Sequence, residues 1–172
     1  MHKIICISRE FSSGGHEIAE KIAERLGIAF YDHQLLDQAA EKSVVDRKLL
    51  EEAEEKAGGF FRYTALYEGD DKELIGKSAN DIIYILQKRL LLNIASKEDA
   101  IIVGRCADDI LQKQGNCLVF SVFITGRYED RLKRCMQVEG VNEKEAKNMI
   151  KKYDKHRKSH YEYYTERDWG KF

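Results

Sequence analysis

Residues 1–27 combine a short apolar run, a polar turn rich in serine and glycine, and a helical repeat of apolar side chains. Residues 3–7 are mostly isoleucine, which predicts a buried strand. After the turn, Ile18, Ile22 and Leu26 recur at helical spacing on one face. Gly27 follows them, where a glycine commonly ends a helix. A strand that leads through a tight turn into a helix favours a sheet covered by helices.

The rest of the chain repeats this alternation. Further strands are predicted at residues 28–31, 100–103 and 118–124. Further helices are predicted at residues 33–42 with Asp32 as N-cap, at 80–96, at 126–140 with Thr125 as N-cap, and after a capping box formed by Asn142 and Glu145. Residues 43–79 give no clear pattern beyond a charged helical stretch around residues 51–56.

Strands that alternate with helices predict a parallel sheet with helices on both faces. Right-handed crossovers place the carboxyl ends of such strands at one edge of the sheet, and ligands bind there. We therefore expect the functional loops to follow the strands that end near residues 7, 31, 103 and 124.

Length and composition exclude several classes of protein. A chain of 172 residues with 43% hydrophobic and 34% charged residues suits one soluble globular domain. The net charge of −1 does not favour nucleic-acid binding. No segment resembles a secretion signal or a membrane helix, and the four cysteines lack the spacing of a zinc site. We expect a cytoplasmic protein without a membrane partner.

The turn from Ser12 to His16 has the composition of a phosphate-binding loop. Glycines let the backbone approach a phosphate closely, and the N-terminus of the following helix adds partial positive charge. Serine hydroxyls at Ser12 and Ser13 can donate further hydrogen bonds. In the standard motif G-x-x-x-x-G-K-[ST], Gly14 would take the last glycine, so that Gly15 replaces the lysine and His16 the hydroxyl residue. A tight turn that merely needs glycine is the alternative.

Several motifs in the same order resemble those of the cytidylate kinase-like family. The first is the run S-R-E-F-S-S-G-G-H-E-I at residues 8–18, and the others lie at residues 31–32, 102–108, 130–131, 154–157, 163–165 and 168–170. The resemblance covers nearly the whole chain.

This resemblance implies a three-layer α/β/α P-loop kinase fold with a parallel sheet and a helical lid. Within one domain over residues 1–172, it implies a monophosphate-binding region over roughly residues 32–99 and a lid over roughly residues 126–167. The family commonly has a further strand and helix beyond the position of Phe172. It also implies ATP with Mg²⁺ as the phosphate donor, and CMP or dCMP as the acceptor.

Phosphoryl transfer needs cations that converge on one place, and arginine grips phosphate with two parallel hydrogen bonds. We predict a catalytic role for Arg9 from its position, and the resemblance to the family lid implies catalytic roles for Arg131 and Arg157. Arg9 lies in the loop and can supply the charge that the missing lysine does not. The predicted ATP phosphate-binding residues are Ser12, Ser13, Gly14, Gly15, His16 and Arg134. The predicted acceptor-binding residues are Asp32 and, as the resemblance implies, Arg105 and Asp154. No residue is predicted to bind a metal directly.

Each of these residues also has a structural interpretation. Asp32 can be a helix cap, Asp154 and Arg157 can form an ion pair between helix positions three apart, and His16 can be an exposed first-turn residue. Two other functions remain open: a nucleotide sensor that binds without transfer, and a kinase for another small acceptor. The sequence does not predict the oligomeric state.

Overall fold

The computed structural model describes residues 1–36 and 71–171 of the chain. Its centre is a four-stranded parallel sheet in the order β2-β3-β1-β4. The strands are β1 (Lys3–Arg9), β2 (Ala29–Tyr31), β3 (Ala100–Val103) and β4 (Leu118–Ile124). All four were predicted, although β1 continues two residues beyond its apolar run, so that Arg9 ends the strand.

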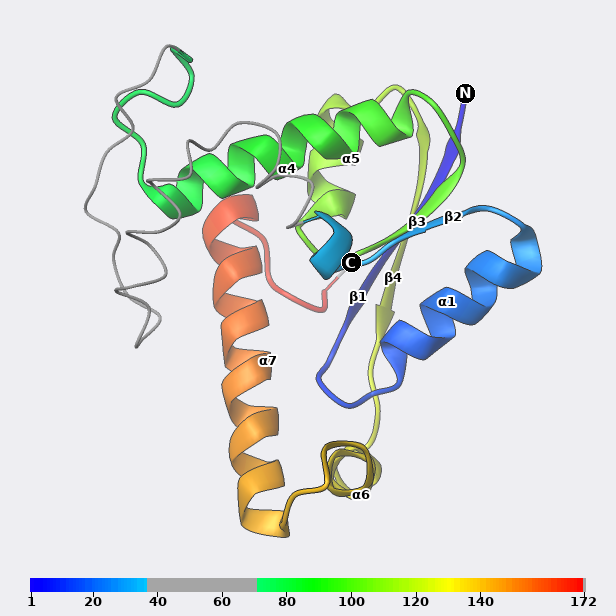
Figure 1. Ribbon diagram of the computed structural model, residues 1–172, viewed down its shortest axis with the longest axis vertical. Helices are drawn as coiled ribbons and strands as arrows, with labels where there is room; N and C mark the ends of the chain where they lie inside the picture. The colour runs from blue at the N-terminus through cyan, green and yellow to red at the C-terminus, as the bar shows by residue number, and fades with distance from the viewer. Residues whose placement is uncertain (37–70, 172) are drawn as a thin grey trace.

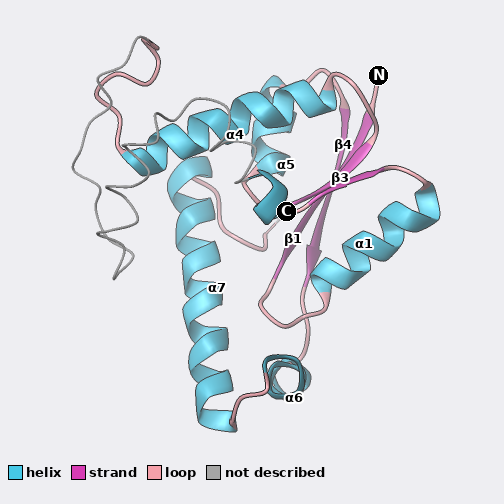
Figure 2. Ribbon diagram, viewed as in Figure 1, coloured by secondary structure: helices cyan, strands magenta, loops and turns pink. Residues whose placement is uncertain are grey.

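The described helices are α1 (Gly15–Leu26), α4 (Ala79–Ala95), α5 (Ala107–Gln114), α6 (Tyr128–Glu139) and α7 (Glu143–Thr165). Helix α1 covers one face of the sheet, and α4, α5 and α7 lie on the other (Figures 1 and 2). This arrangement confirms the predicted three-layer α/β/α fold. A helical turn also begins at His33, and the rest of the helix predicted for 33–42, like the helical stretch at 51–56, lies outside the described residues.

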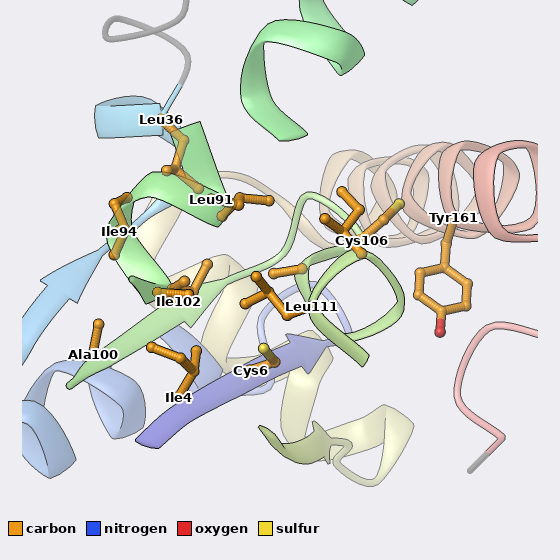
Figure 3. Close-up of a cluster of buried hydrophobic side chains, with 13 residues drawn as sticks. Ile4, Cys6, Leu36, Leu91, Ile94, Ala100, Ile102, Cys106, Leu111 and Tyr161 are labelled. Atoms are coloured by element: carbon orange, nitrogen blue, oxygen red, sulfur yellow. The ribbon is translucent and has the colours of Figure 1, made fainter. Parts of the chain in front are cut away.

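Alternation along the central strands divides the core into two layers. Ile4 and Cys6 of β1 face the side of α4 and α5, together with Ala100 and Ile102 of β3. Figure 3 shows these side chains gathered with Leu111 of α5, Leu91 and Ile94 of α4, and Tyr161 of α7. Odd-numbered residues of the same strands face α1. Burial on both faces is the physical reason for the continuous apolar runs that predicted these strands.

Two local predictions are wrong in detail. Ala19 and Ala23 form the buried face of α1, whereas Ile18 and Leu26 are 41% and 56% exposed. Alanine lets the helix lie close to the sheet, so the larger side chains turn outward. Helix α6 has Arg127 rather than Thr125 as its N-cap, because the Thr125 hydroxyl donates instead to the carboxylate of Glu10, with an O–O distance of 2.6 Å.

The short helix α5 was not predicted. Its N-cap Cys106 completes a run of left-handed residues, Gly104, Arg105 and Cys106, that turns the chain sharply after β3. The capping box of α7 is confirmed, with the Asn142 side chain accepting from the Glu145 amide. After α7 the chain returns to the sheet, where Trp169 packs edge-on against Phe123 of β4 at a centroid distance of 5.0 Å. No helix in the described part of the chain is long and apolar enough to span a membrane.

Candidate functional site

A pocket lies at the carboxyl end of β1, where the predicted loop joins α1. Its volume is about 210 Å³, and its walls come from the loop, the start of α1, α6 and α7. Whole drug-sized ligands occupy pockets of about 300–1,000 Å³. The volume therefore suits part of a nucleotide, such as its phosphates, better than an entire one. Eight predicted site residues line it: Arg9, Ser12, Ser13, Gly14, Gly15, His16, Arg134 and Arg157.

The loop turns through two left-handed residues, Ser12 at φ 60° and Gly14 at φ 79°. Gly14 is the N-cap of α1, and no side chain caps the helix there. The first-turn amides of an α-helix have no partner within the helix, and they favour negative charge. Because the loop backbone and this helix end both line the pocket, the site can cradle an anion.

Arg9 lies directly across Gly15. A Cβ atom added to Gly15 would stand 2.6 Å from the Cβ of Arg9 and 2.9 Å from its Cγ. At the other end of the side chain, a Cβ on Gly104 would stand 2.8 Å from Nη1 of Arg9. The side chain therefore runs from the loop toward the end of β3, through space that two glycines leave open. A lysine at position 15 would collide with it.

Three arginines converge on this point. Burial lowers the pKa of Arg9 from its ordinary value, and the nearby charges of Arg157 and Arg105 lower it further. Arginine nevertheless stays cationic at neutral pH. Within residues 1–36 and 71–171, the Arg9 guanidinium makes no hydrogen bond or ion pair. A partly buried cation beside two others is a favourable place for a polyanion.

Arg157 and Arg134 complete the basic wall of the pocket. Arg157 reaches from α7 and donates from Nη1 to the backbone oxygen of Arg9 at 3.2 Å. Burial lowers its pKa, and Arg131 lowers it further while Asp154 opposes the shift. Arg134 reaches from α6, so that its guanidinium lies 3.7–3.9 Å from where a Cβ on Gly14 would stand. Arg134 also forms an ion pair with Glu17 of α1.

His16 joins the loop to the predicted acceptor side. Its Nε2 lies 3.2 Å from Oδ2 of Asp32, and Oδ1 of Asp32 accepts from the amide of Leu35 at 2.9 Å. Asp32 is therefore a helix cap, as its structural interpretation predicted. Burial opposes ionisation of Asp32, but the Leu35 amide and the rings of His16 and His33 together hold its pKa below the ordinary value.

Arg105 follows β3 and does not line the pocket. Its positive charge lowers the pKa values of Arg9 in β1 and of His156 and His160 in α7. Arg105 has a left-handed backbone at φ 57°. Such conformations cost about 1–3 kcal/mol outside glycine and cluster at functional sites.

Arg131 and Asp154 lie beside the pocket rather than in its lining. Arg131 is only 5% exposed and pairs with both Asp154 and Glu10. The structure therefore pairs Asp154 with Arg131, not with Arg157 as the ion-pair interpretation had it. Their predicted roles toward ATP and the acceptor stay predictions.

Sequence analysis missed six residues at this site. The pocket is also lined by Glu10, Phe11, Glu17, His33, Val138 and Glu139. A carboxylate at Glu10, next to Arg9 in a loop expected to bind phosphate, was the available signal. Val138 and Glu139 end α6, and nothing in the sequence pattern identifies them as pocket residues. Among the described residues, no group of three or more His, Cys, Asp or Glu side chains could hold a metal ion.

Comparisons with known proteins agree with this geometry. A sequence profile described as the cytidylate kinase-like family matches residues 4–172. No curated protein matches the chain at a significant level. The structure of an uncharacterized protein from Eubacterium ventriosum ATCC 27560 is 35% identical with a TM-score of 0.71, and the match covers 99% of this chain and 82% of that one.

A second solved structure extends the likeness in fold. A gluconokinase from Sinorhizobium meliloti 1021 is 14% identical with a TM-score of 0.50, and the match covers 90% of this chain and 74% of that one. At this identity the likeness concerns the fold alone. Together with the parallel sheet and the loop at the end of β1, these matches show a P-loop kinase fold.

Proposed function

The chain belongs to the cytidylate kinase-like family, and from that membership we propose that it is a nucleotide kinase that transfers the γ-phosphate of ATP to CMP or dCMP. The observation that carries the proposal is the convergence of Arg9, Arg157 and Arg134 on a glycine loop at the start of α1. Family membership suggests the chemistry, and the arginines suggest how it proceeds without the loop lysine.

In the proposed reaction, the ATP phosphates lie on the backbone from Ser12 to His16. Arg9 takes the place of the lysine, because its side chain crosses the position that Gly15 leaves open. An oxygen of the acceptor phosphate bonds to the γ-phosphorus while the bond to the bridging oxygen breaks, and ADP leaves with that electron pair. Arg9 and Arg157 would balance the negative charge on the transferred group.

Magnesium would arrive with ATP, bound to its phosphate oxygens, and would neutralise part of their charge. The position of the usual hydroxyl ligand is held by His16, whose Nε2 pairs with Asp32. A neutral imidazole is a poor ligand for this hard cation. We therefore assign His16 to the phosphates and to Asp32, and we assign no direct metal ligand.

The acceptor would bind on the far side of Arg9, against Arg105 and Asp32. The charges of both act on the pKa of Arg9, which supports this position for the acceptor. Arg105 suits the phosphate of the acceptor because its planar fork matches phosphate oxygens. We place this reaction in the cytoplasm, which the four free cysteines favour.

The test is the release of ADP from MgATP, with and without CMP, dCMP, UMP or AMP, by the full natural protein. Acceleration by CMP or dCMP above the others is expected, and Arg105→Ala should raise KM for the acceptor more than KM for ATP. No acceleration by any of the four would refute the proposed acceptor. ATP binding without turnover would then favour a nucleotide sensor, for which Gly15 in the lysine position is the supporting observation.

A further inference from the structure

Arg131 of α6 connects the stem of the phosphate loop to α7. Its Nε donates to the backbone oxygen of Phe11 at 2.8 Å, its Nη1 lies 3.1 Å from Oε2 of Glu10, and its Nη2 pairs with Asp154. Asp154 also accepts from the Phe11 amide at 2.6 Å. We call Glu10, Phe11, Arg131 and Asp154 the Arg131 network. Each nitrogen of the guanidinium serves a different partner.

The network fixes the whole backbone of the loop stem. The Glu10 amide donates to the oxygen of Ile124 at 3.0 Å, and the Glu10 oxygen accepts from the Ser13 hydroxyl at 2.9 Å. Both backbone groups of Phe11 are bound within the network. Every backbone donor and acceptor of these two residues is therefore used, immediately before the loop turns into the pocket.

Side chains add to the same attachment. Oε2 of Glu10 accepts from the Thr125 hydroxyl at 2.6 Å and from the Gly126 amide at 3.2 Å, which ties the stem to the end of β4. The ring of Phe11 stacks on Tyr153 of α7 at a centroid distance of 4.5 Å. Figure 1 shows α6 and the lower part of α7 beside the turn between β1 and α1.

We propose that α6 and α7 form a fixed wall of the phosphate site rather than a moving lid, an inference that rests on the proposed function. Glu10, Arg131 and Asp154 are then positioning residues for the loop. Closure of α6 and α7 over the loop would break several partly buried, charge-assisted hydrogen bonds at once, and such bonds are costly to leave unmade. The loop is thus preorganised before nucleotide binds.

The first test needs no nucleotide. Hydrogen exchange of the amides at residues 10–16 is measured in the ligand-free full chain for Glu10→Gln and Arg131→Lys. Both should exchange at least about tenfold faster than wild type, because local opening becomes easier. Asp130→Asn is the matched control, since its exposed carboxylate pairs with Arg127 on the same helix. Unchanged exchange in a folded Glu10→Gln protein would overturn the proposal.

The lysine variant separates the two roles of Arg131. Lysine keeps the positive charge but cannot serve three partners with a planar fork. A fixed wall predicts that Arg131→Lys is nearly as harmful as Arg131→Met to MgATP affinity. A lid residue that neutralises phosphate predicts that lysine preserves much of it. Arg131→Met can unfold the chain, so the isosteric variant Glu10→Gln is measured as well. Glu10→Gln should raise KM for ATP about tenfold and leave kcat within about twofold of wild type.

Wild-type protein provides the last comparison. With saturating MgATP, exchange across residues 128–165 should change by less than about twofold, whereas residues 12–17 should become protected. Protection of about tenfold along α7 would show that the helices close, and would overturn the proposal. If no acceptor supports turnover, the proposed kinase function fails. The ligand-free exchange experiment still decides whether the Arg131 network holds the loop in place.

Discussion

Arg9 and Gly15 share one space: the Cβ of Arg9 lies 2.6 Å from where a Cβ on Gly15 would stand. Residue 15 is glycine because the arginine six positions earlier passes over it. The usual loop lysine and this arginine are therefore alternatives that exclude one another. This relationship explains why the loop has glycine where the standard motif has lysine. It also predicts that the positive charge can be moved between positions 9 and 15, which can be tested.

Replacing Arg9 should separate binding from stability. In Arg9→Met, MgATP affinity should fall about 10- to 100-fold, since hydrogen bonds to charged groups contribute about 1.5–3 kcal/mol. The ligand-free Tm should stay the same or rise, because the variant removes a partly buried cation near two others. Calorimetric titration and thermal unfolding measure the two effects. Arg25→Met, at an exposed position on α1, is the control. Affinity within twofold of wild type would rule out a role for Arg9 in phosphate binding.

Moving the charge back to position 15 should require removal of the arginine. Gly15→Lys alone should lower the free energy of unfolding by about 1–3 kcal/mol through overpacking. The double variant Arg9→Gly/Gly15→Lys should bind MgATP more tightly than Arg9→Gly alone, because the lysine then has room to reach the phosphates. Urea unfolding and ATP titration measure the two effects. If the double variant binds no better than Arg9→Gly, the two positions are not interchangeable.

His160 should make stability depend on pH. Burial first, then the charges of Arg105 and His156, lower its pKa to about 4. In the unfolded chain the ring titrates near its ordinary pKa of about 6.5. As the pH falls from about 6.5 to about 4, the unfolded chain gains a proton that the folded chain does not, so the free energy of unfolding decreases.

Urea unfolding at several pH values measures this effect. His160→Gln should flatten the profile over that window. Equal slopes for wild type and His160→Gln would contradict the assignment of a neutral, partly buried ring.

Tyr161 should contribute to stability and not to nucleotide binding. Its hydroxyl donates to Oδ2 of Asp108 at 2.7 Å, and both residues are buried. Tyr161→Phe leaves that carboxylate without its donor and should cost about 1.5–3 kcal/mol of unfolding free energy. Tyr163→Phe, at a side chain that is 72% exposed, is the matched control and should be nearly neutral. Loss of MgATP affinity in folded Tyr161→Phe would contradict a purely structural role.

Local sequence patterns predict most of the fold. The apolar runs at β1, β3 and β4, the cap at Gly27 and the capping box at Asn142 depend on neighbouring residues, so the sequence alone predicts them. Helix α5 was missed because it is only eight residues long and buries two aspartates, Asp108 and Asp109. These charged residues interrupt the apolar periodicity that predicts a buried helix face. The orientation of α1 was misjudged because the periodicity does not show that alanine is the contact surface.

The site was predicted as a set of residues but not as a geometry. The glycine loop follows from composition and spacing, and the roles of Arg134 and Arg157 from the family resemblance; with Arg9 they line one pocket. The Arg131 network could not be predicted, because Glu10 and Phe11 lie more than a hundred residues before Arg131 and Asp154 along the chain. Burial decides that Arg131 holds the loop stem, and burial depends on the assembled structure.

The chain has a single tryptophan, and its place gives the molecule a built-in optical reporter. Trp169 packs edge-on against Phe123, and a Cβ on Gly170 would stand 3.2 Å from the same ring. Its emission therefore records whether the segment after α7 is seated on β4. A change in emission wavelength that precedes the loss of helical circular dichroism would show that this segment detaches before the domain unfolds.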